Sequence, residues 1–320
     1  MDTTMKARKA AIIGVGHVGA HAAFALTTQG IVDEIVLIDK DPKKTRSEVQ
    51  DLNDALLMLP YSVKITEGTY EDLKDTDLIV YSVGDIELLR ADHDRIHELS
   101  FNTKQLKETA AKIKNSGFDG ILINISNPCD VITALLDETL GLPKGHVFGT
   151  GTALDTSRLL SVLSKKTGID ERSITAYMLG EHGNEQFAPR SILSFKGAPL
   201  SSIESTAGPF DWTAIEKDAI AGGWITFSGK YCTEYGIAAT GARLARAVLR
   251  NEHLIMPVSA PLTGQYGQSG LFAGVPAVIG SGGIEQVIEL PLTETERERF
   301  DACAQTIRNN LQTARELLSK

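Results

Sequence analysis

Short apolar runs alternate with segments of helical length over the first half of the chain. The runs are of the kind that parallel strands show when both faces are buried. They lie at residues 10–13, 35–38, 63–65, 78–83 and 121–125. Segments that fit helices lie between them, at residues 17–29, 42–59 and 101–115. This alternation predicts an α/β fold with a doubly wound parallel sheet that ends near residue 150.

The pattern changes in the second half. A predicted helix at residues 153–167 is followed by alternating stretches at residues 192–195 and 275–279, separated by glycine-rich turns. The last helix begins at Thr293, where Glu296 completes a capping box. We therefore predict two domains, residues 1–150 and residues 151–320, the second being α+β with antiparallel strands.

Composition narrows the class of protein. The chain has 320 residues, of which 42% are hydrophobic and 23% are charged. This length is sufficient for two domains or for one unusually large domain. Its net charge of -9, without a long basic block, argues against nucleic-acid and anionic-membrane partners. Three scattered cysteines without a CxxC indicate neither disulfides nor structural zinc, and no apolar run is long enough to span a membrane. We expect a soluble, cytoplasmic protein.

A glycine motif follows the first predicted strand. Gly14, Gly16 and Gly19 spell GxGxxG, which permits a tight turn and a close approach of the backbone to a diphosphate. The second strand ends at Asp39, at about the spacing expected for an acidic partner of the adenosine ribose. A glycine turn chosen for packing is the alternative. The combination predicts a Rossmann domain that binds a dinucleotide.

The charge of Asp39 favours NAD over NADP. Its carboxylate can accept hydrogen bonds from both ribose hydroxyls and would repel a 2′-phosphate, although Lys40 and Lys43 lie nearby. Gly84, after the fourth strand, would let the backbone run close to the cofactor. A simple strand-ending glycine explains Gly84 equally well.

Three polar residues of the second half are candidates for chemistry. His182 lies in the segment LGEHGNEQF, between an acid and a glycine. Asp155 and Arg158 lie one helical turn apart, so one helix could offer a carboxylate to the imidazole and a guanidinium to a substrate. The alternative is an ordinary surface ion pair.

Metal binding is not predicted. His17 and His21 have the i,i+4 spacing of zinc-binding pairs, as do His93 and His97. Neither pair stands in a HExxH setting or has a third ligand near it in the sequence, so solvated or capping roles are expected.

Five motifs, in order along nearly the whole chain, resemble the L-lactate and L-malate dehydrogenase superfamily. They are GVGHVG at Gly14, ISNPCDV around Asn127, GTGTALDTSR around Asp155 and Arg158, LGEHGN at His182 and KYCTEYGIA around Thr233. The residues in these motifs are most similar to those of the L-2-hydroxyisocaproate dehydrogenase branch. The resemblance implies an NAD-dependent L-2-hydroxyacid dehydrogenase that acts on an aliphatic 2-oxo acid. It also implies a homodimer or homotetramer.

The resemblance also implies roles for individual residues. His182 would exchange a proton with the substrate oxygen, oriented by Asp155. Arg158 would bind the substrate carboxylate through two parallel hydrogen bonds. Asn127 would bind the substrate oxygen beside the nicotinamide. Thr233 would line the substrate pocket and Ile237 would press on the nicotinamide, though both could equally fill the core.

A mobile loop of the family supplies a further arginine, which polarises the carbonyl. Arg95 is the predicted residue, because the pattern RIHELSFNTKQL matches the start of the following helix; Arg90 is the rival. Counting back along the loop gives Leu88 as the residue that sets side-chain specificity.

The apolar residues Ile86, Leu88 and Leu89 suggest a pocket wall for an aliphatic substrate side chain. L-lactate dehydrogenase is the nearest alternative, with pyruvate as the 2-oxo acid. L-malate dehydrogenase and a catalytically silent NAD-binding sensor are further alternatives.

Overall fold

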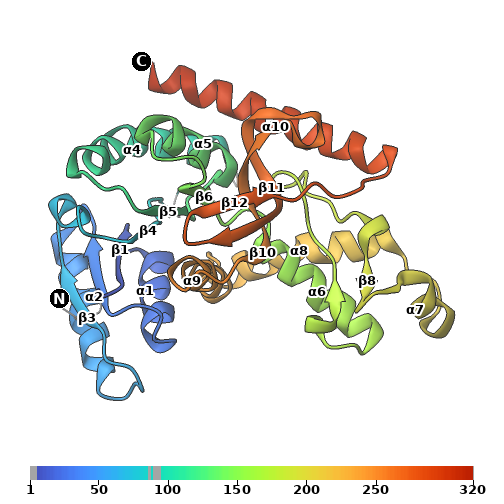
Figure 1. The fold of residues 1–320 in the computed structure, drawn as a ribbon, viewed down its shortest axis with the longest axis horizontal. Helices are drawn as coiled ribbons and strands as arrows, with labels where there is room; N and C mark the ends of the chain where they lie inside the picture. The colour runs from blue at the N-terminus through green and yellow to red at the C-terminus, as the bar shows by residue number, and fades with distance from the viewer. Residues whose placement is uncertain (1–5, 86–87, 89–94, 320) are drawn as a thin grey trace.

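The computed structural model describes residues 6–85, 88 and 95–319, apart from the side chains of residues 95–97, 206 and 207. A nine-stranded sheet runs through the molecule in the order β12-β11-β10-β6-β5-β4-β1-β2-β3 (Figure 1). Its first six strands in sequence pair in parallel. They are β1 (Lys9–Ile13), β2 (Glu34–Ile38), β3 (Lys64–Glu67), β4 (Leu78–Tyr81), β5 (Ile121–Asn124) and β6 (Val147–Gly149).

Helices cover both faces of this sheet. The side chains of β1 from Ala10 to Ile13 are apolar because both faces of the strand are buried. Ala10 and Ile12 join the core under α1 (His17–Thr28) and α9 (Tyr235–Leu249). The alternate residues Ala11 and Ile13 join the core under helices of the opposite face. Those helices are α4 (Arg95–Ser116), α5 (Cys129–Leu140) and the last turns of α10 (Glu294–Leu318).

The predicted doubly wound sheet is confirmed, with two differences. Every predicted run of the first half is a strand, and α1 and α2 (Pro42–Leu56) lie where helices were expected. Helix α5 and strand β6 were not predicted. Nine of the twelve residues of α5 are buried. It therefore lacks the polar face that marks a surface helix in a sequence.

Antiparallel strands of the second half extend the same sheet. They are β10 (Leu254–Thr263), β11 (Ser269–Gly280) and β12 (Gly283–Val287), and β10 pairs with β6 at Ser259 and Gly149. The predicted antiparallel character is confirmed, and residues 275–279 lie within β11. One sheet thus crosses the predicted domain boundary.

A smaller lobe lies beside the sheet and has its own core (Figure 1). It contains α6 (Ala153–Thr167), α7 (Leu200–Ala207) and α8 (Trp212–Lys230), with the short sheet β7 (Ile174–Thr175), β8 (Ser194–Phe195) and β9 (Ala198–Pro199). Single turns of 3-10 helix lie at Tyr70–Leu73, Glu171–Ser173, Arg190–Ile192 and Gln265–Gly267. The predicted capping box of Thr293 and Glu296 begins α10.

Candidate active site

The glycine turn joins β1 to α1, and its three glycines meet different surroundings. Gly14 has φ 89°, and a Cβ there would lie 2.5 Å from the Ser82 carbonyl oxygen. A Cβ on Gly19 would lie 1.9 Å from the Gly14 oxygen, so α1 packs directly on the turn. At Gly16 no described atom lies within 4 Å of such a Cβ. Space is therefore left at Gly16, beside the first N–H groups of α1, where a diphosphate can bind.

Asp39 follows β2 and is tied to this turn. One carboxylate oxygen accepts a hydrogen bond from the Val15 N–H at 2.8 Å, and the other accepts one from the Asp41 N–H at 3.0 Å. The sequence spacing predicted a ribose partner but did not reveal this support of the turn. The carboxylate is half-buried, so it remains accessible from the turn.

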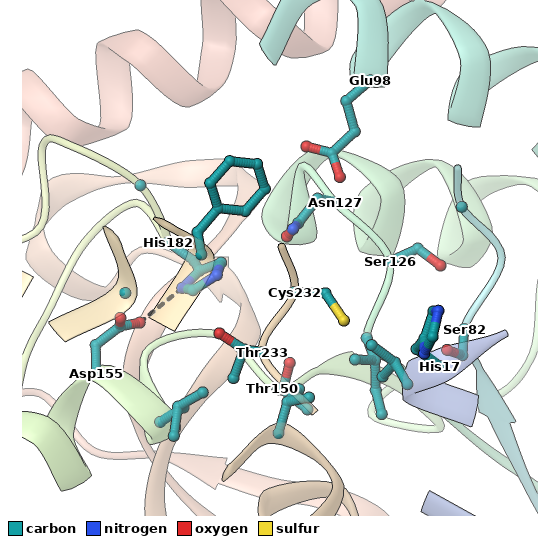
Figure 2. Close-up of a pocket in the computed structure, with 18 of the residues that line it drawn as sticks. His17, Ser82, Glu98, Ser126, Asn127, Thr150, Asp155, His182, Cys232 and Thr233 are labelled. Carbon is teal, nitrogen blue, oxygen red and sulfur yellow. Dashed lines mark hydrogen bonds and ion pairs between the residues drawn. The ribbon is translucent and has the colours of Figure 1, made fainter. Parts of the chain in front are cut away.

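A cavity of about 490 Å³ opens beyond the carboxyl ends of β1, β4 and β5. This is the end of a parallel sheet at which open α/β folds bind ligands. Eight predicted site residues line the cavity, and they come from both halves of the chain (Figure 2). They are Gly16, Gly84, Asn127, Asp155, Arg158, His182, Thr233 and Ile237. Gly14, Gly19, Asp39 and Leu88 are not part of the lining.

His182 and Asp155 form a hydrogen-bonded pair at one end of this cavity. The Nδ1 of His182 lies 2.6 Å from an Asp155 carboxylate oxygen (Figure 2). The Asp155 side chain is 3% exposed and that of His182 is 21% exposed. With Nδ1 directed at the carboxylate, Nε2 on the opposite side of the ring is the atom that can exchange a proton with a ligand.

The charge of Asp155 is stabilised despite its burial. Burial alone would raise its pKa, but the hydrogen bond and charge of His182, with the charge of Arg158, lower the pKa below its usual value. The carboxylate is therefore ionised at neutral pH and can stabilise a protonated imidazole.

Arg158 lies on the same helix, α6, one turn after Asp155. One terminal nitrogen donates to Asp155 at 2.9 Å, and the other donates to the Thr233 hydroxyl at 3.4 Å. Only 17% of the Arg158 side chain is exposed, which excludes the alternative of a surface ion pair. A planar guanidinium held at a cavity wall suits a carboxylate ligand.

Two glycines of α8 make room for this arginine. A Cβ on Gly222 would lie 3.2 Å from Arg158 Cδ, and one on Gly223 would lie 3.3 Å from Arg158 Nη1. Both distances are shorter than ordinary van der Waals contacts. These glycines were missed, since a glycine pair within a helix carries no sign of its partner.

The loop after β5 presents Asn127 to the cavity. Asn102 donates a hydrogen bond to the Asn127 carbonyl oxygen at 2.6 Å. Beneath it, the fully buried Asn124 amide donates to the Ser126 and Cys129 carbonyls and to the Thr133 hydroxyl. Asn102 and Asn124 were not predicted from the sequence.

Asp130 is a buried acid that supports His182 from below. It accepts a hydrogen bond from the His182 backbone N–H at 2.9 Å and one from the Ser259 hydroxyl at 2.5 Å. Burial raises its pKa to about 6, against these hydrogen bonds, which favour the charged form. The motif ISNPCDV contained Asp130, but nothing in it indicated contact with a residue 52 positions away.

A further wall of the cavity comes from α8. Ile220, Trp224 and Phe227 line it at helical spacing. Such a stripe is visible in the sequence, but it is more often interpreted as core.

The predicted loop arginine is not placed by the described atoms. Arg95 is the first residue of α4, and its side chain lies outside the described part of the structure. Its rival Arg90, with Ile86 and Leu89, lies outside the described residues altogether. Leu88 is described and half-buried, and its N–H donates to the Asp85 carbonyl oxygen. Asp85 lines the cavity, but Leu88 does not.

No helix within the described ranges has the length and apolar character needed to cross a membrane.

Comparison with known proteins agrees with this arrangement. Residues 8–149 match the lactate/malate dehydrogenase NAD binding domain, and residues 152–318 match the alpha/beta C-terminal domain of the same family. An L-lactate dehydrogenase of Fusobacterium nucleatum is 41% identical, covering 94% of this chain and 95% of that protein. L-lactate dehydrogenase 1 of Bifidobacterium longum is 37% identical, covering 96% and 98%.

Solved structures give the same result. The minor L-lactate dehydrogenase from Enterococcus mundtii, in its ligands-bound form, is 33% identical with a TM-score of 0.91, covering 96% of this chain and 98% of that one. A lactate dehydrogenase from a Medee basin deep-sea metagenome library is also 33% identical, with a TM-score of 0.92 and coverage of 99% and 100%. The chain belongs to the lactate/malate dehydrogenase family, whose members are NAD-dependent 2-hydroxyacid oxidoreductases.

Proposed function

We propose that the protein interconverts a 2-oxo acid and an L-2-hydroxy acid, with pyruvate and L-lactate as the principal pair. The observation that carries the proposal is one cavity in which the His182–Asp155 pair and Arg158 face the glycine turn of the NAD-binding domain. The similar proteins named above are L-lactate dehydrogenases, which favours pyruvate over the longer 2-oxoisocaproate expected from the sequence.

The nicotinamide of NADH, when bound, supplies hydride to the substrate carbon. Gly14, Gly16 and Gly19 would hold its diphosphate and Asp39 its adenosine ribose. Gly84, Asn127 and Ile237 would surround the rest of the cofactor. Open space at Gly16 and the accessible carboxylate of Asp39 fit these roles.

His182 moves the proton in this mechanism. Its Nε2 donates to the ketone oxygen during reduction and accepts the proton again during oxidation. Asp155 holds the imidazole through Nδ1 and stabilises the charge that the ring carries before it donates. The lowered pKa of Asp155 supports this role, because only an ionised carboxylate stabilises an imidazolium.

Arg158 and Thr233 orient the substrate. The guanidinium binds the substrate carboxylate, while the Thr233 hydroxyl, 3.4 Å from Arg158, fixes one end of the guanidinium. Asn127 donates a hydrogen bond to the reacting oxygen. Arg95, at the start of α4, is proposed as the loop arginine that polarises the carbonyl.

A longer aliphatic substrate is the second candidate. The observation that favours it is the apolar wall of Ile220, Trp224 and Phe227, which offers contact to a branched side chain. Leu88, which the sequence suggested as the residue that sets side-chain specificity, does not line the cavity. One buried methylene changes selectivity by only about 1 to 3 kcal/mol, so both substrates can be turned over.

A substrate series tests these alternatives. We would compare kcat/KM for NADH oxidation with pyruvate, 2-oxoisocaproate, phenylpyruvate and oxaloacetate. Pyruvate is expected to give the highest value. A higher kcat/KM for 2-oxoisocaproate than for pyruvate would instead favour the longer aliphatic substrate. Fastest turnover of oxaloacetate would contradict both candidate substrates, because neither proposed site includes a second cation for the distal carboxylate of oxaloacetate.

The protein is further proposed to be a cytoplasmic homodimer or homotetramer. Support for assembly comes from large apolar side chains that are exposed on the isolated chain. Among them are Ile225 on α8 and Tyr235 on α9.

A further inference from the structure

A second group of polar side chains lies on the wall of the cavity away from Asp155. His17 begins α1, whereas Cys232 and Glu234 lie in the turn between α8 and α9. One potential ligand atom from each residue lies within 4.8 Å of the other two. Figure 2 shows the His17 ring on the side opposite the Asp155–His182 pair, with the Cys232 sulfur between them.

We propose that His17, Cys232 and Glu234 bind a divalent cation of the zinc class. Imidazole, thiolate and carboxylate are the three side-chain ligands that Zn²⁺ takes in proteins. Three protein ligands leave a fourth position open, and here both His17 and Cys232 line the cavity. The proposed ion would therefore sit between the protein and the cavity.

The spacing requires only small movements. In a tetrahedral zinc site, two ligand atoms lie roughly 3.3 to 3.6 Å apart, as follows from the metal–ligand distances. His17 Nδ1 and Glu234 Oε1 are already 3.0 Å apart. The His17 side chain is 65% exposed and can adjust, whereas Cys232, at 7% exposure, is held by its surroundings.

The carboxylate of Glu234 is oriented for this purpose. Its Oε2 forms an ion pair with Lys230, one helical turn earlier, which leaves Oε1 on the side of His17. On binding, the cation would take the place of the Cys232 thiol proton.

These ligands could not be assembled from the sequence. The absence of a predicted metal site followed from local spacing, in which His17 was paired only with His21. The fold instead brings Cys232 and Glu234 to His17 from the other half of the chain. The proposed site consists of these side chains alone, so cation binding can be tested without cofactor or substrate.

Titration of the full-length, chelator-treated protein with Co²⁺ tests the site directly. We expect one equivalent of Co²⁺ per chain, with an absorption band from thiolate to cobalt in the near ultraviolet, and displacement by Zn²⁺. His17→Gln, at an exposed position, should fold normally and bind at least about tenfold more weakly. Cys232→Ala should lose the thiolate band.

A matched control removes a histidine from another acidic partner. His253 lies 2.8 Å from Glu285, neither residue lines the cavity, and His253→Gln should leave the titration unchanged. Absence of a thiolate band in the unmodified protein would overturn the proposal. So would equal Co²⁺ affinity of the unmodified protein and His17→Gln, whatever the activity of either.

Discussion

At the scale of single residues, the site depends on one buried carboxylate with two basic neighbours. One carboxylate oxygen of Asp155 is hydrogen-bonded to His182 Nδ1, and the other accepts a hydrogen bond from Arg158. Each neighbour then keeps a separate task, because the imidazole can exchange a proton and the guanidinium cannot. In the proposed mechanism, the same residue therefore organises both proton transfer and substrate binding.

Replacement of Arg158 by lysine tests the geometry of substrate binding. An ammonium keeps the charge but cannot form two parallel hydrogen bonds to a carboxylate. Arg158→Lys should lower kcat/KM for pyruvate, chiefly through KM, by about 2 kcal/mol or more. Steady-state kinetics measure this loss. Arg172→Lys, at an exposed pair with Asp170, is the control and should behave as the unmodified enzyme.

Asp130 gives a prediction about pH. Its folded pKa of about 6 lies above the ordinary value of 3.8, so between these values the folded protein holds a proton that the unfolded chain has released. Its contribution to the free energy of unfolding therefore falls as pH rises through this window. Asp130→Asn does not titrate there. The variant should gain stability relative to the unmodified protein, by up to about 3 kcal/mol, between pH 4 and pH 6.

Urea unfolding at fixed protein concentration measures this difference. A stability difference that stayed constant from pH 4 to pH 6 would contradict the assignment of a raised pKa to Asp130.

The sequence singled out the residues proposed for the chemistry, but it did not indicate the residues that hold them in place. His182, Asp155 and Arg158 stand in short motifs, and their residue types already suggest their tasks. Asp130 and Gly223 act through contacts with residues far along the chain, on His182 and Arg158 respectively. No local pattern encodes such contacts, so only the fold could reveal them.

At the scale of elements, two glycines of the glycine turn should affect different properties. Gly19 should matter for the stability of the fold, and Gly16 for the binding of the cofactor. Gly19→Ala places a Cβ against the Gly14 carbonyl and should destabilise the protein by about 1 to 3 kcal/mol. Gly16→Ala meets open space and should change stability by less than about 0.5 kcal/mol. It should nevertheless weaken NADH binding about tenfold, or about 1.4 kcal/mol.

Thermal unfolding and NADH fluorescence titration distinguish the two effects. If Gly16→Ala bound NADH as tightly as the unmodified protein, the diphosphate would not lie against this turn.

The start of α4 carries the unsettled arginine. Arg95→Gln should lower kcat by roughly 10²-fold or more, because a cation that polarises the carbonyl is lost. Arg90→Gln should leave kcat unchanged and is the matched control in the same loop. Turnover of pyruvate by the two variants decides between them, and the reverse result would move the role to Arg90.

Among the elements, the predicted strands were reliable because their apolar runs are short and bounded by turns. Helix α5 escaped prediction because it is buried on nearly all sides, so its sequence lacks an amphipathic period.

At the scale of the whole molecule, one sheet unites the two predicted halves. The pairing of β6 with β10 joins Gly149 to Ser259. Ser259 in turn donates to Asp130, which holds the backbone of His182. Pairing between such distant strands has no local signature, so the sequence predicted antiparallel strands without their place in the sheet. The cavity between the halves follows from that pairing.

In the proposed mechanism His182 transfers the proton, and a different set of residues binds the cofactor. The most direct measurement is single-turnover oxidation of NADH with saturating pyruvate by His182→Asn, alongside NADH binding by fluorescence. The rate should fall about 10²- to 10⁴-fold, because asparagine cannot donate the proton. NADH affinity should be retained, since the glycine turn and Asp39 are untouched. An unchanged rate of NADH oxidation would show that His182 does not transfer the proton.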